Sequence, residues 1–282
     1  MKADRSGPRR PAWFFVALLA WAPVILVLDG RLAAPWPWQY VLGAATFGVL
    51  WLATTRLERR DRAQVWLCVG VATGFEYLGS QVWGGYRYRF GGIPLFVPPG
   101  HGLIYVFAIA LAATEWVRRY ERAFTYAVFG FAAAWVIAGL VLLPPVTNRL
   151  DVHGAMWLPL FGYVVLFSPR RAIFAAIFIA TTDVELAGTW TRSWTWMTTI
   201  PWYHVGSGNP PSAIAGGYAI IDGTVLLLSA PVLRLISYRA NMRARTANSA
   251  IPTYRRPSPA PSAPNASALS ARRFAAPTSA RD

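Results

Sequence analysis

The sequence has few of the residues that usually support cofactor or disulfide chemistry. It contains one cysteine and three histidines in 282 residues, and only 14% of its residues are charged. A lone cysteine, Cys68, excludes an intrachain disulfide. The histidines are too far apart to match a zinc-binding spacing, and the sequence has no phosphate-binding glycine loop, nucleophile elbow or aspartate-rich diphosphate motif. The sequence therefore predicts no metal site and no cofactor.

Long apolar runs take up most of the chain, and hydrophobic residues make up 55% of it. A hydrocarbon core of ~30 Å is crossed by about 20 helical residues. We expect eight transmembrane helices, at about 11–30, 35–55, 63–84, 93–116, 125–145, 154–168, 172–192 and 212–236. The predicted fold class is an all-α integral membrane protein. As an alternative, the first run follows Arg9 and Arg10 and resembles a cleavable signal peptide.

The net charge of +15 follows the order of the loops. Loops rich in arginine alternate with loops that hold only Arg31, Arg87, Arg89, Arg149 and Arg192. Arginine and lysine remain on the cytoplasmic side of a membrane, so both termini should be cytoplasmic and the protein should lie in the cell membrane. We interpret the excess positive charge as orienting the chain in the bilayer, and we expect no nucleic-acid partner. The sequence leaves the oligomeric state open.

The ends of the chain differ in composition from the apolar centre. We expect residues 1–10 to form a short cytoplasmic segment and 11–236 to form the membrane domain. Residues 237–282 are rich in proline, serine, alanine and arginine, and such a segment buries too little apolar surface to fold. The sequence predicts a disordered basic tail, either solvated or resting on anionic lipid.

One short sequence frame occurs twice. In each copy, a glutamate within an apolar run is followed by a glycine three residues later, an aromatic pair around one polar residue, an Ile-Pro pair and a Pro-Pro pair. The matched residues are Glu76 and Glu185, Gly79 and Gly188, Tyr86-Arg87-Tyr88 and Trp194-Thr195-Trp196, Ile93-Pro94 and Ile200-Pro201, and Pro98-Pro99 and Pro210-Pro211. This frame predicts two parallel four-helix repeats, at about 11–116 and 125–236.

A carboxylate inside hydrocarbon is a functional hypothesis by default. We expect Glu76 and Glu185 to converge on one cavity in the outer half of the membrane. With Asp183 they are the candidate catalytic residues, although helical phase predicts that Asp183 points away from Glu185. The candidate substrate-binding residues are Tyr86, Tyr88, Trp194, Trp196, His101, His204, Asn209 and Asp222. As alternatives, the glutamates pair with arginines at the membrane edge and the aromatics are interfacial anchors.

The chemistry available to such a site is acid catalysis. A carboxyl group in apolar surroundings keeps its proton at neutral pH, and aromatic faces stabilise a cation. We expect Glu76, beside Phe75 and Tyr77, to donate the proton. We expect Glu185, near Asp183 and Arg192, to stay ionised and to orient water or balance a carbocation.

Several segments resemble one family of integral-membrane carotenoid-biosynthesis proteins, which includes the carotenoid (bisanhydrobacterioruberin-type) hydratases. The resembling stretches are Gly74-Phe-Glu76-Tyr-Leu-Gly79, Gly85-Tyr86-Arg-Tyr88, Gly92-Ile-Pro94-Leu-Phe-Val-Pro98, Trp194-Thr-Trp196 and Ile200-Pro201-Trp202-Tyr203 with Asn209. The resemblance covers about residues 70–225. It implies addition of water across a terminal carotenoid double bond, at a site lined by Glu76, Tyr86, Tyr88, Trp194, Trp196 and Asn209.

We therefore expect a cofactor-independent membrane enzyme that hydrates or cyclises a hydrophobic, isoprenoid-like polyene. Two alternatives remain open on the sequence. One is a membrane carrier for a lipid-like or small organic solute, which would use the same repeat interface. The other is a non-catalytic membrane assembly protein.

Overall fold

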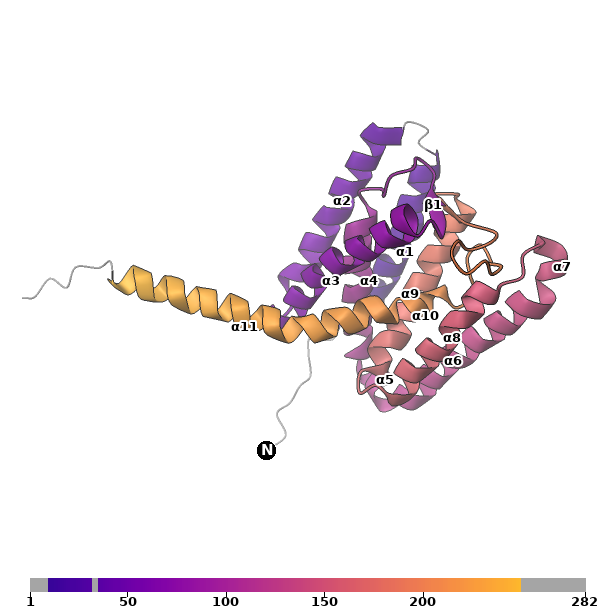
Figure 1. Ribbon diagram of the computed structural model, residues 1–282. Helices are drawn as coiled ribbons and strands as arrows, with labels where there is room; N and C mark the ends of the chain where they lie inside the picture. The colour runs from indigo at the N-terminus through magenta and orange to yellow at the C-terminus, as the bar shows by residue number, and fades with distance from the viewer. Residues whose placement is uncertain (1–9, 32–34, 250–282) are drawn as a thin grey trace, which may run out of the picture. The chain divides into compact units, whose positions relative to one another are not determined.

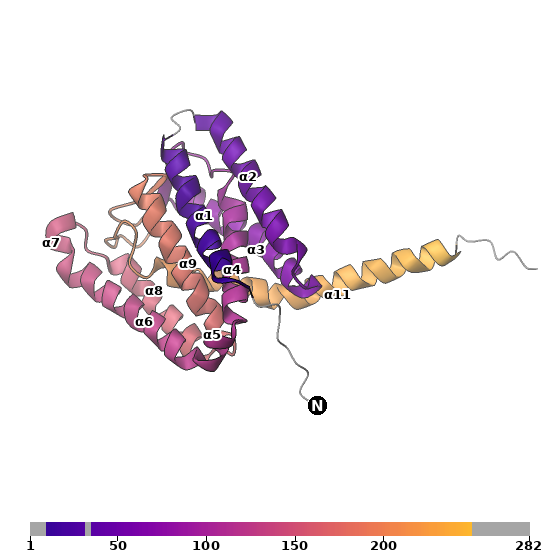
Figure 2. The same ribbon diagram turned by 180° about the vertical axis from the view of Figure 1, so that it is seen from behind.

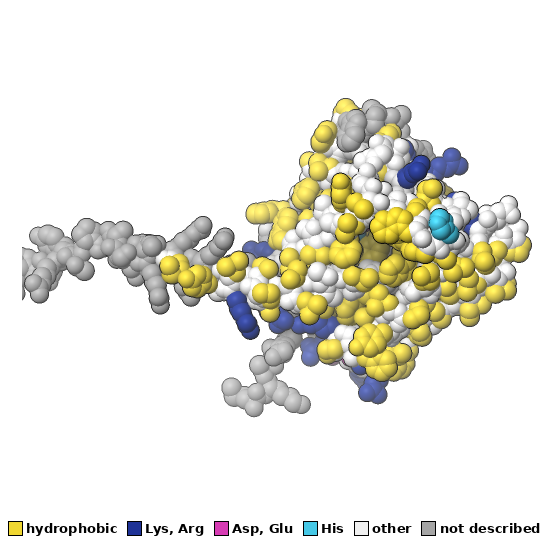
Figure 3. Space-filling view, in the orientation of Figure 1, with side chains coloured by type: hydrophobic (Ala, Val, Ile, Leu, Met, Phe, Trp, Pro, Cys, Tyr) yellow, Lys and Arg dark blue, Asp and Glu magenta, His cyan; other side chains and the backbone are white. Residues whose placement is uncertain are grey.

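The computed structural model describes residues 10–31 and 35–249, which are mostly helical. Among these residues, four helices are long and apolar enough to cross a membrane: Ala12–Gly30, Glu121–Leu142, Arg171–Trp190 and Ile214–Leu235. Two more apolar helices, Val97–Ala112 and Val152–Phe167, are shorter. In Figure 3 hydrophobic side chains are spread over the visible face, and arginine side chains lie mainly toward its edges. The predicted helical class is confirmed.

Helices occupy all eight predicted runs. The first four runs contain α1 (Ala12–Arg31), α2 (Pro35–Thr55), α3 (Arg59–Tyr77) with the π-helical turn η1 (Leu78–Val82), and α4 (Val97–Ala112). The other four contain α6 (Glu121–Ile137) with the π-helical turn η2 (Ala138–Leu142), α8 (Val152–Phe167), α9 (Arg171–Trp190), and α10 (Ile214–Gly217) with α11 (Ala219–Ser249). Two short helices, α5 (Glu115–Arg119) and α7 (Pro144–Thr147), lie in connections.

Helices α4 and α9 form the centre of the first compact unit, which extends to Ile236. They pack against each other, and α1 packs against both (Figures 1 and 2). Small residues on α9, including Ala175, Ala176 and Ala180, are buried and allow this close packing between helices. By contrast, only 17% of the apolar stretch of α1 is buried. α1 is therefore an outer wall of the bundle.

A two-stranded antiparallel ladder joins the two copies of the sequence frame. Strand β1 (Tyr86–Tyr88) pairs with β2 (Trp194–Trp196), and Arg87 lies opposite Thr195. Successive side chains of a strand point to opposite faces, so the four aromatic rings are buried while Arg87 and Thr195 are exposed. The sequence pattern did not predict these strands.

The second compact unit is Ser237–Asp282, and the structure describes it only as far as Ser249. There α11 continues past residue 236, where the sequence analysis ended the membrane domain. Residues 237–249 contain no proline or glycine and several good helix formers, so a helix is favoured up to the residues that precede Pro252. Residues 1–9 and 250–282, on which most of the predicted terminal segments fall, lie outside the described residues.

Candidate active site

Glu76 lies in the last turn of α3 and is 5% exposed. The hydroxyls of Tyr86 and Tyr88 each donate a hydrogen bond to its Oε2 atom at 2.5 Å. Its Oε1 atom lies 2.9 Å from Nε2 of His101, near the beginning of α4. Distances of 2.5 Å are typical of hydrogen bonds from a hydroxyl to an ionised oxygen. We call Glu76, Tyr86, Tyr88 and His101 the Glu76 cluster.

Glu185 lies near the end of α9 and is 4% exposed. The indole N–H groups of Trp194 and Trp196 donate to its Oε2 atom, each at 3.0 Å. The hydroxyl of Tyr218, which follows α10, donates to Oε1 at 3.2 Å. We call these four residues the Glu185 cluster. The two clusters touch, because the rings of His101 and Tyr218 stack with centroids 5.5 Å apart.

Two glycines of the frame make room for the ladder's aromatic rings. A Cβ atom at Gly188 would lie 2.0 Å from Trp194, and one at Gly79 would lie 3.0 Å from Tyr86. Each glycine lies one turn beyond its glutamate, so the ring packs on bare backbone while its polar atom reaches the carboxylate. This explains why the glutamate and the glycine recur together at the same spacing.

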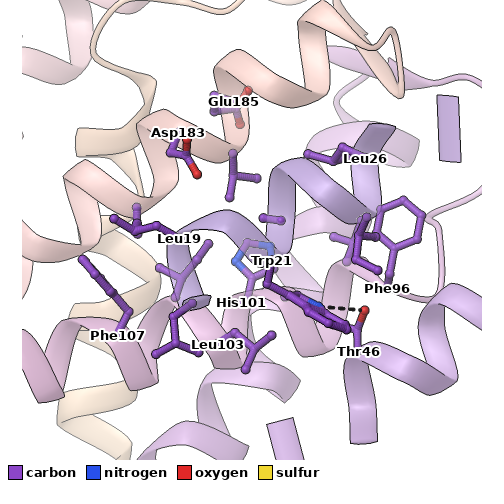
Figure 4. A pocket seen from close by; sticks show the side chains of 18 of the residues that line it. Leu19, Trp21, Leu26, Thr46, Phe96, His101, Leu103, Phe107, Asp183 and Glu185 are labelled. Atoms are coloured by element: carbon purple, nitrogen blue, oxygen red, sulfur yellow. Dashed lines mark hydrogen bonds between the residues drawn. The ribbon is translucent and has the colours of Figure 1, made fainter. Parts of the chain in front are cut away.

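Both glutamates line one cavity. Figure 4 shows Glu185 and His101 among its lining residues. The centre of a water-sized molecule can occupy about 70 Å³ of this cavity. One water needs about 10–15 Å³ by this measure, so the cavity holds a few waters or one end of a larger molecule. Much of its apolar wall comes from α1, namely Leu18, Leu19, Trp21, Ala22, Ile25 and Leu26.

Asp183 lines the same cavity as Glu185, which corrects the expectation that it points elsewhere. Figure 4 shows both carboxyl groups extending from α9. The cavity lies where α1 covers α9, and the consecutive residues Asp183, Val184 and Glu185 all line it, so it extends around this part of α9. The Oδ2 atom of Asp183 is buried and has no hydrogen-bond partner among the described residues. It differs in this respect from both glutamates.

The other predicted site residues fall into three groups. Tyr86, Tyr88, Trp194 and His101 line the cavity, and Trp196 bonds to Glu185 without lining it. Asn209 supports the ladder, because its Oδ1 atom accepts the backbone N–H of Trp196 at 2.9 Å. His204 is exposed in a turn, and Asp222 is buried but does not line this cavity. The structure therefore does not place His204 or Asp222 with the glutamates.

The physical reason expected for the roles of the two glutamates does not hold. Glu76 was expected in apolar surroundings, but three donor side chains surround its carboxyl group. Glu185 also accepts three hydrogen bonds, and the exposed Arg192 is not among the donors. The alternative in which the glutamates pair with arginines is also wrong for Arg89. Its guanidinium donates to the backbone oxygen of Asp29 at 3.0 Å instead.

Two polar clusters near the ladder were missed by the sequence analysis. Asp29, 3% exposed at the end of α1, accepts Ser193 at 2.8 Å and Gln39 at 3.1 Å. Asp151, also 3% exposed, accepts three backbone N–H groups, from Gly154, Gly208 and Ser212. One signal in the sequence could have identified both clusters, because Asp29 and Asp151 each lie at the edge of an apolar run.

A buried histidine of α8 supports the ladder from the other side. His153 is fully buried, and its ring contacts that of Trp196 with centroids 5.6 Å apart. Its Nδ1 atom lies 3.0 Å from the hydroxyl of Tyr203. Burial raises the pKa of Tyr203 to about 12, so this hydroxyl keeps its proton at neutral pH. His153 therefore acts as a satisfied packing residue behind the site.

Among the described residues, no three His, Cys, Asp or Glu side chains come together as a group able to hold a metal ion. No protein-family model, no curated protein and no solved structure matches the chain. The arrangement itself thus carries the functional argument. It combines three carboxyl groups, one imidazole and several phenol and indole groups around a small apolar cavity.

Proposed function

We propose that this protein is a cofactor-independent membrane enzyme that protonates a carbon–carbon double bond of an isoprenoid-like polyene and thereby hydrates or cyclises it. The observation that carries the proposal is the cavity in which Asp183 has an unpartnered carboxyl oxygen between apolar walls, beside two carboxylates that accept full sets of hydrogen bonds. An acid with no competing hydrogen bond, facing an apolar substrate, suits protonation of carbon.

The proposed architecture is eight transmembrane helices in two parallel repeats, with both termini cytoplasmic. The register of the ladder supports the repeats. Tyr86 pairs with Trp196 and Tyr88 pairs with Trp194, while Arg87 pairs with Thr195. Exchanging the two copies of the frame leaves this set of pairs unchanged, as a two-fold axis that passes between Arg87 and Thr195 requires. Parallel repeats in membrane proteins are related by such an axis along the membrane normal.

In the proposed reaction, the proton of the Asp183 carboxyl group bonds to one carbon of the double bond, using the π electrons, and the other carbon becomes a carbocation. The Asp183 carboxylate that remains, the Glu185 carboxylate and the aromatic faces of Tyr86 and Trp194 stabilise this cation. In hydration, the oxygen of a water molecule bonds to the cation and the resulting oxonium loses a proton. In cyclisation, a second double bond attacks the cation and an adjacent carbon loses the proton.

The Glu76–His101 pair is the proposed base that receives this proton. Oε2 of Glu76 is already occupied by two phenols, so the hydrogen bond between Oε1 and the imidazole is the place where a further proton is held. His101 lines the cavity and can pass the proton onward. Its return to Asp183 restores the enzyme, and the net reaction consumes no proton.

The apolar wall formed by α1 indicates that the substrate comes from the bilayer. A long polyene exceeds the volume of the cavity, so only its end enters, and the rest remains among lipid chains. α1 separates the cavity from the outer surface of the bundle and is itself largely exposed. Displacement of α1 is therefore the proposed route of entry.

One observation favours a carrier as the second candidate. Helix α3 changes to the π-helical turn η1 directly after Glu76 and Tyr77. Breaks in a helix at the level of a buried carboxylate are typical of transporters, and π-helical turns often occur at functional sites. A carrier would bind the lipid-like solute in the same cavity without changing it.

The test is expression of the full chain in cells that accumulate acyclic polyenes, followed by mass analysis of the extracted pigments. Hydration adds the mass of one water, whereas cyclisation leaves the mass unchanged and alters absorption and retention. The Asp183→Asn, Glu76→Gln and Glu185→Gln variants should each lose about 10²- to 10⁴-fold of this activity, the usual contribution of acid–base groups.

The control is Glu58→Gln, which alters an exposed carboxyl group just before α3 and should keep full activity. Membrane extraction and thermal unfolding of each variant establish that it is inserted and folded. Unchanged pigments with a wild-type protein that binds polyene would contradict the enzyme and favour the carrier. Full activity of Asp183→Asn would refute its role as the acid.

A further inference from the structure

A second group of buried polar residues lies outside the cavity. Asp222 of α11 is 3% exposed, Tyr105 of α4 is 1% exposed and Thr181 of α9 is fully buried. Each has one side-chain oxygen that is buried and without a hydrogen-bond partner among the described residues. Buried polar groups are nearly always hydrogen-bonded, so these three oxygens, half of the six such side-chain atoms among the described residues, need an explanation.

These three residues belong to the same part of the core. Tyr105 packs in one cluster with Ile177 and Ala180 of α9 and with Ile221 and Val225 of α11. Thr181 follows Ala180 directly and lies one turn from Ile177, and Asp222 follows Ile221 directly. The three oxygens therefore belong to three helices that meet around Tyr105, within an otherwise apolar environment.

The charged neighbours of this group are few. Asp222 lies within electrostatic range of the thiol of Cys68 and of the hydroxyl of Tyr105. Cys68, Arg170 and Asp61 also act on Tyr105. Among the described residues, no ion pair of Asp222 is found, and an ionised carboxylate without a cation is costly in an apolar core. A protonated carboxyl group bridged by water to neighbouring hydroxyls avoids this cost.

The group lies between one end of the bundle and the active-site cavity. Arg170 and Asp61 are at the ends where α9 and α3 begin. In the other direction, the Cys68 thiol donates to the backbone oxygen of His101 at 3.9 Å, and His101 lines the cavity. Ionisable residues in membrane interiors commonly serve as proton relays.

We propose that Asp222, Tyr105 and Thr181 form a second buried site, which binds a proton through bridging water and exchanges it with the end of the bundle at Arg170 and Asp61. The site holds its proton whether the cavity carries out catalysis or transport, so it does not depend on the proposed function. Its chemistry requires only a carboxyl group, two hydroxyls and water.

The experiment is infrared spectroscopy of the full-length protein in lipid nanodiscs at neutral pH. Wild type should show the carbonyl stretch of a protonated carboxyl group, which shifts when H₂O is replaced by D₂O. Asp222→Asn should remove part of that intensity, because Asp183 also holds a proton in the proposed mechanism. Tyr105→Phe should retain the band but slow its exchange about tenfold, the factor that corresponds to losing one hydrogen bond in the path.

Two further variants separate this site from the active-site cavity. Asp183→Asn removes a different carboxyl group and should leave the exchanging band of Asp222 in place. Thr181→Val keeps the shape of the side chain and should shift the frequency of the Asp222 band. This variant provides the test if Asp222→Asn proves too unstable to measure. Unchanged intensity in Asp222→Asn, or exchange in Tyr105→Phe as fast as in wild type with no frequency shift in Thr181→Val, would overturn the proposal.

Discussion

The Glu76 and Glu185 clusters share one geometry and differ in chemistry. In both, a buried glutamate near the end of a helix accepts two hydrogen bonds from alternate residues of a short strand, and a third from the chain that follows. Around Glu76 the donors are two phenols and an imidazole. Around Glu185 they are two indoles and a phenol.

This difference in donors separates what the two carboxylates can do. An indole N–H only donates, so Trp194 and Trp196 cannot exchange a proton with the Glu185 carboxyl group. An imidazole accepts as well as donates, so His101 can take part in proton transfer with Glu76. In the proposed mechanism, the same frame thus supplies a negative charge in one copy and a proton-exchanging pair in the other.

The largest effect on polyene conversion should come from replacing the residue that forms the third hydrogen bond to a glutamate. This residue is His101 for Glu76 and Tyr218 for Glu185. His101→Gln retains a hydrogen-bonding side chain but removes the titratable ring, and polyene conversion should fall about 10²- to 10⁴-fold. Tyr218→Phe removes only one donor from a carboxylate that keeps two, so about a tenfold loss is expected. The measurement is initial rate of product formation against pH for both variants. Equal losses, with pH profiles of the same shape, would remove the distinction between the clusters.

The first helices of the two halves also differ, and a disulfide tests that difference. α1 packs on α4 and α9 over the cavity, whereas α6 packs on α8 and α9. A Cβ atom at Gly30 would lie 3.5 Å from Cβ of Thr191, within the range of disulfides. Gly30→Cys with Thr191→Cys should therefore fix the end of α1 to the end of α9. Oxidation should slow polyene conversion about tenfold or more, because the disulfide would block the displacement of α1 that admits the substrate.

Reduction of the same sample supplies the matched control for this disulfide. Added thiol should restore conversion, and each single-cysteine variant should be insensitive to oxidant because native Cys68 is buried. Full activity in a completely oxidised sample would show that the substrate enters by a path other than displacement of α1.

The two frame glycines should differ in their tolerance of a methyl group. Gly188→Ala places Cβ 2.0 Å from Trp194, and overpacking of this kind costs about 1–3 kcal/mol or more. Gly79→Ala meets the edge of Tyr86 at 3.0 Å, so a smaller loss is expected. A Cβ atom at Gly74 of α3 would meet nothing within 4 Å, so Gly74→Ala should be neutral or stabilising. Thermal unfolding midpoints in detergent give the order, and a Gly79→Ala variant less stable than Gly188→Ala would reverse the comparison.

The sequence predicted those parts of the structure that depend on local pattern. Apolar length placed the helices, and the duplicated frame identified Glu76, Glu185, Gly79, Gly188 and the aromatic pairs. Helical phase failed for Asp183, because it treats a helix as having one functional face, whereas α9 is surrounded by α1, α4 and α6.

What the sequence could not predict depends on contacts between distant segments. The pairing of Tyr86–Tyr88 with Trp194–Trp196 turns two short aromatic segments into a ladder, and only that ladder aims their polar atoms at the glutamates. The strands are too short to show a period-2 pattern of their own. Likewise, Asp222 was placed with the site by its depth along a helix, while its helix directs it toward Tyr105.

The smallest predicted effect, on thermal stability, concerns a contact between the first and second halves of the sequence that lies away from the ladder. Between α3 and α11, the amide of Gln64 donates to the hydroxyl of Ser229 at 3.2 Å, and both side chains are buried. Ser229→Ala should cost about 0.6 kcal/mol, a typical value for a hydrogen bond between membrane helices. Thr224→Val is the control, because the Thr224 hydroxyl bonds only to Ile220 of its own helix at 2.8 Å. Thermal unfolding of both variants should show a lower midpoint for Ser229→Ala alone. A cost several times larger would mean that this contact, and not only the ladder, holds the halves together.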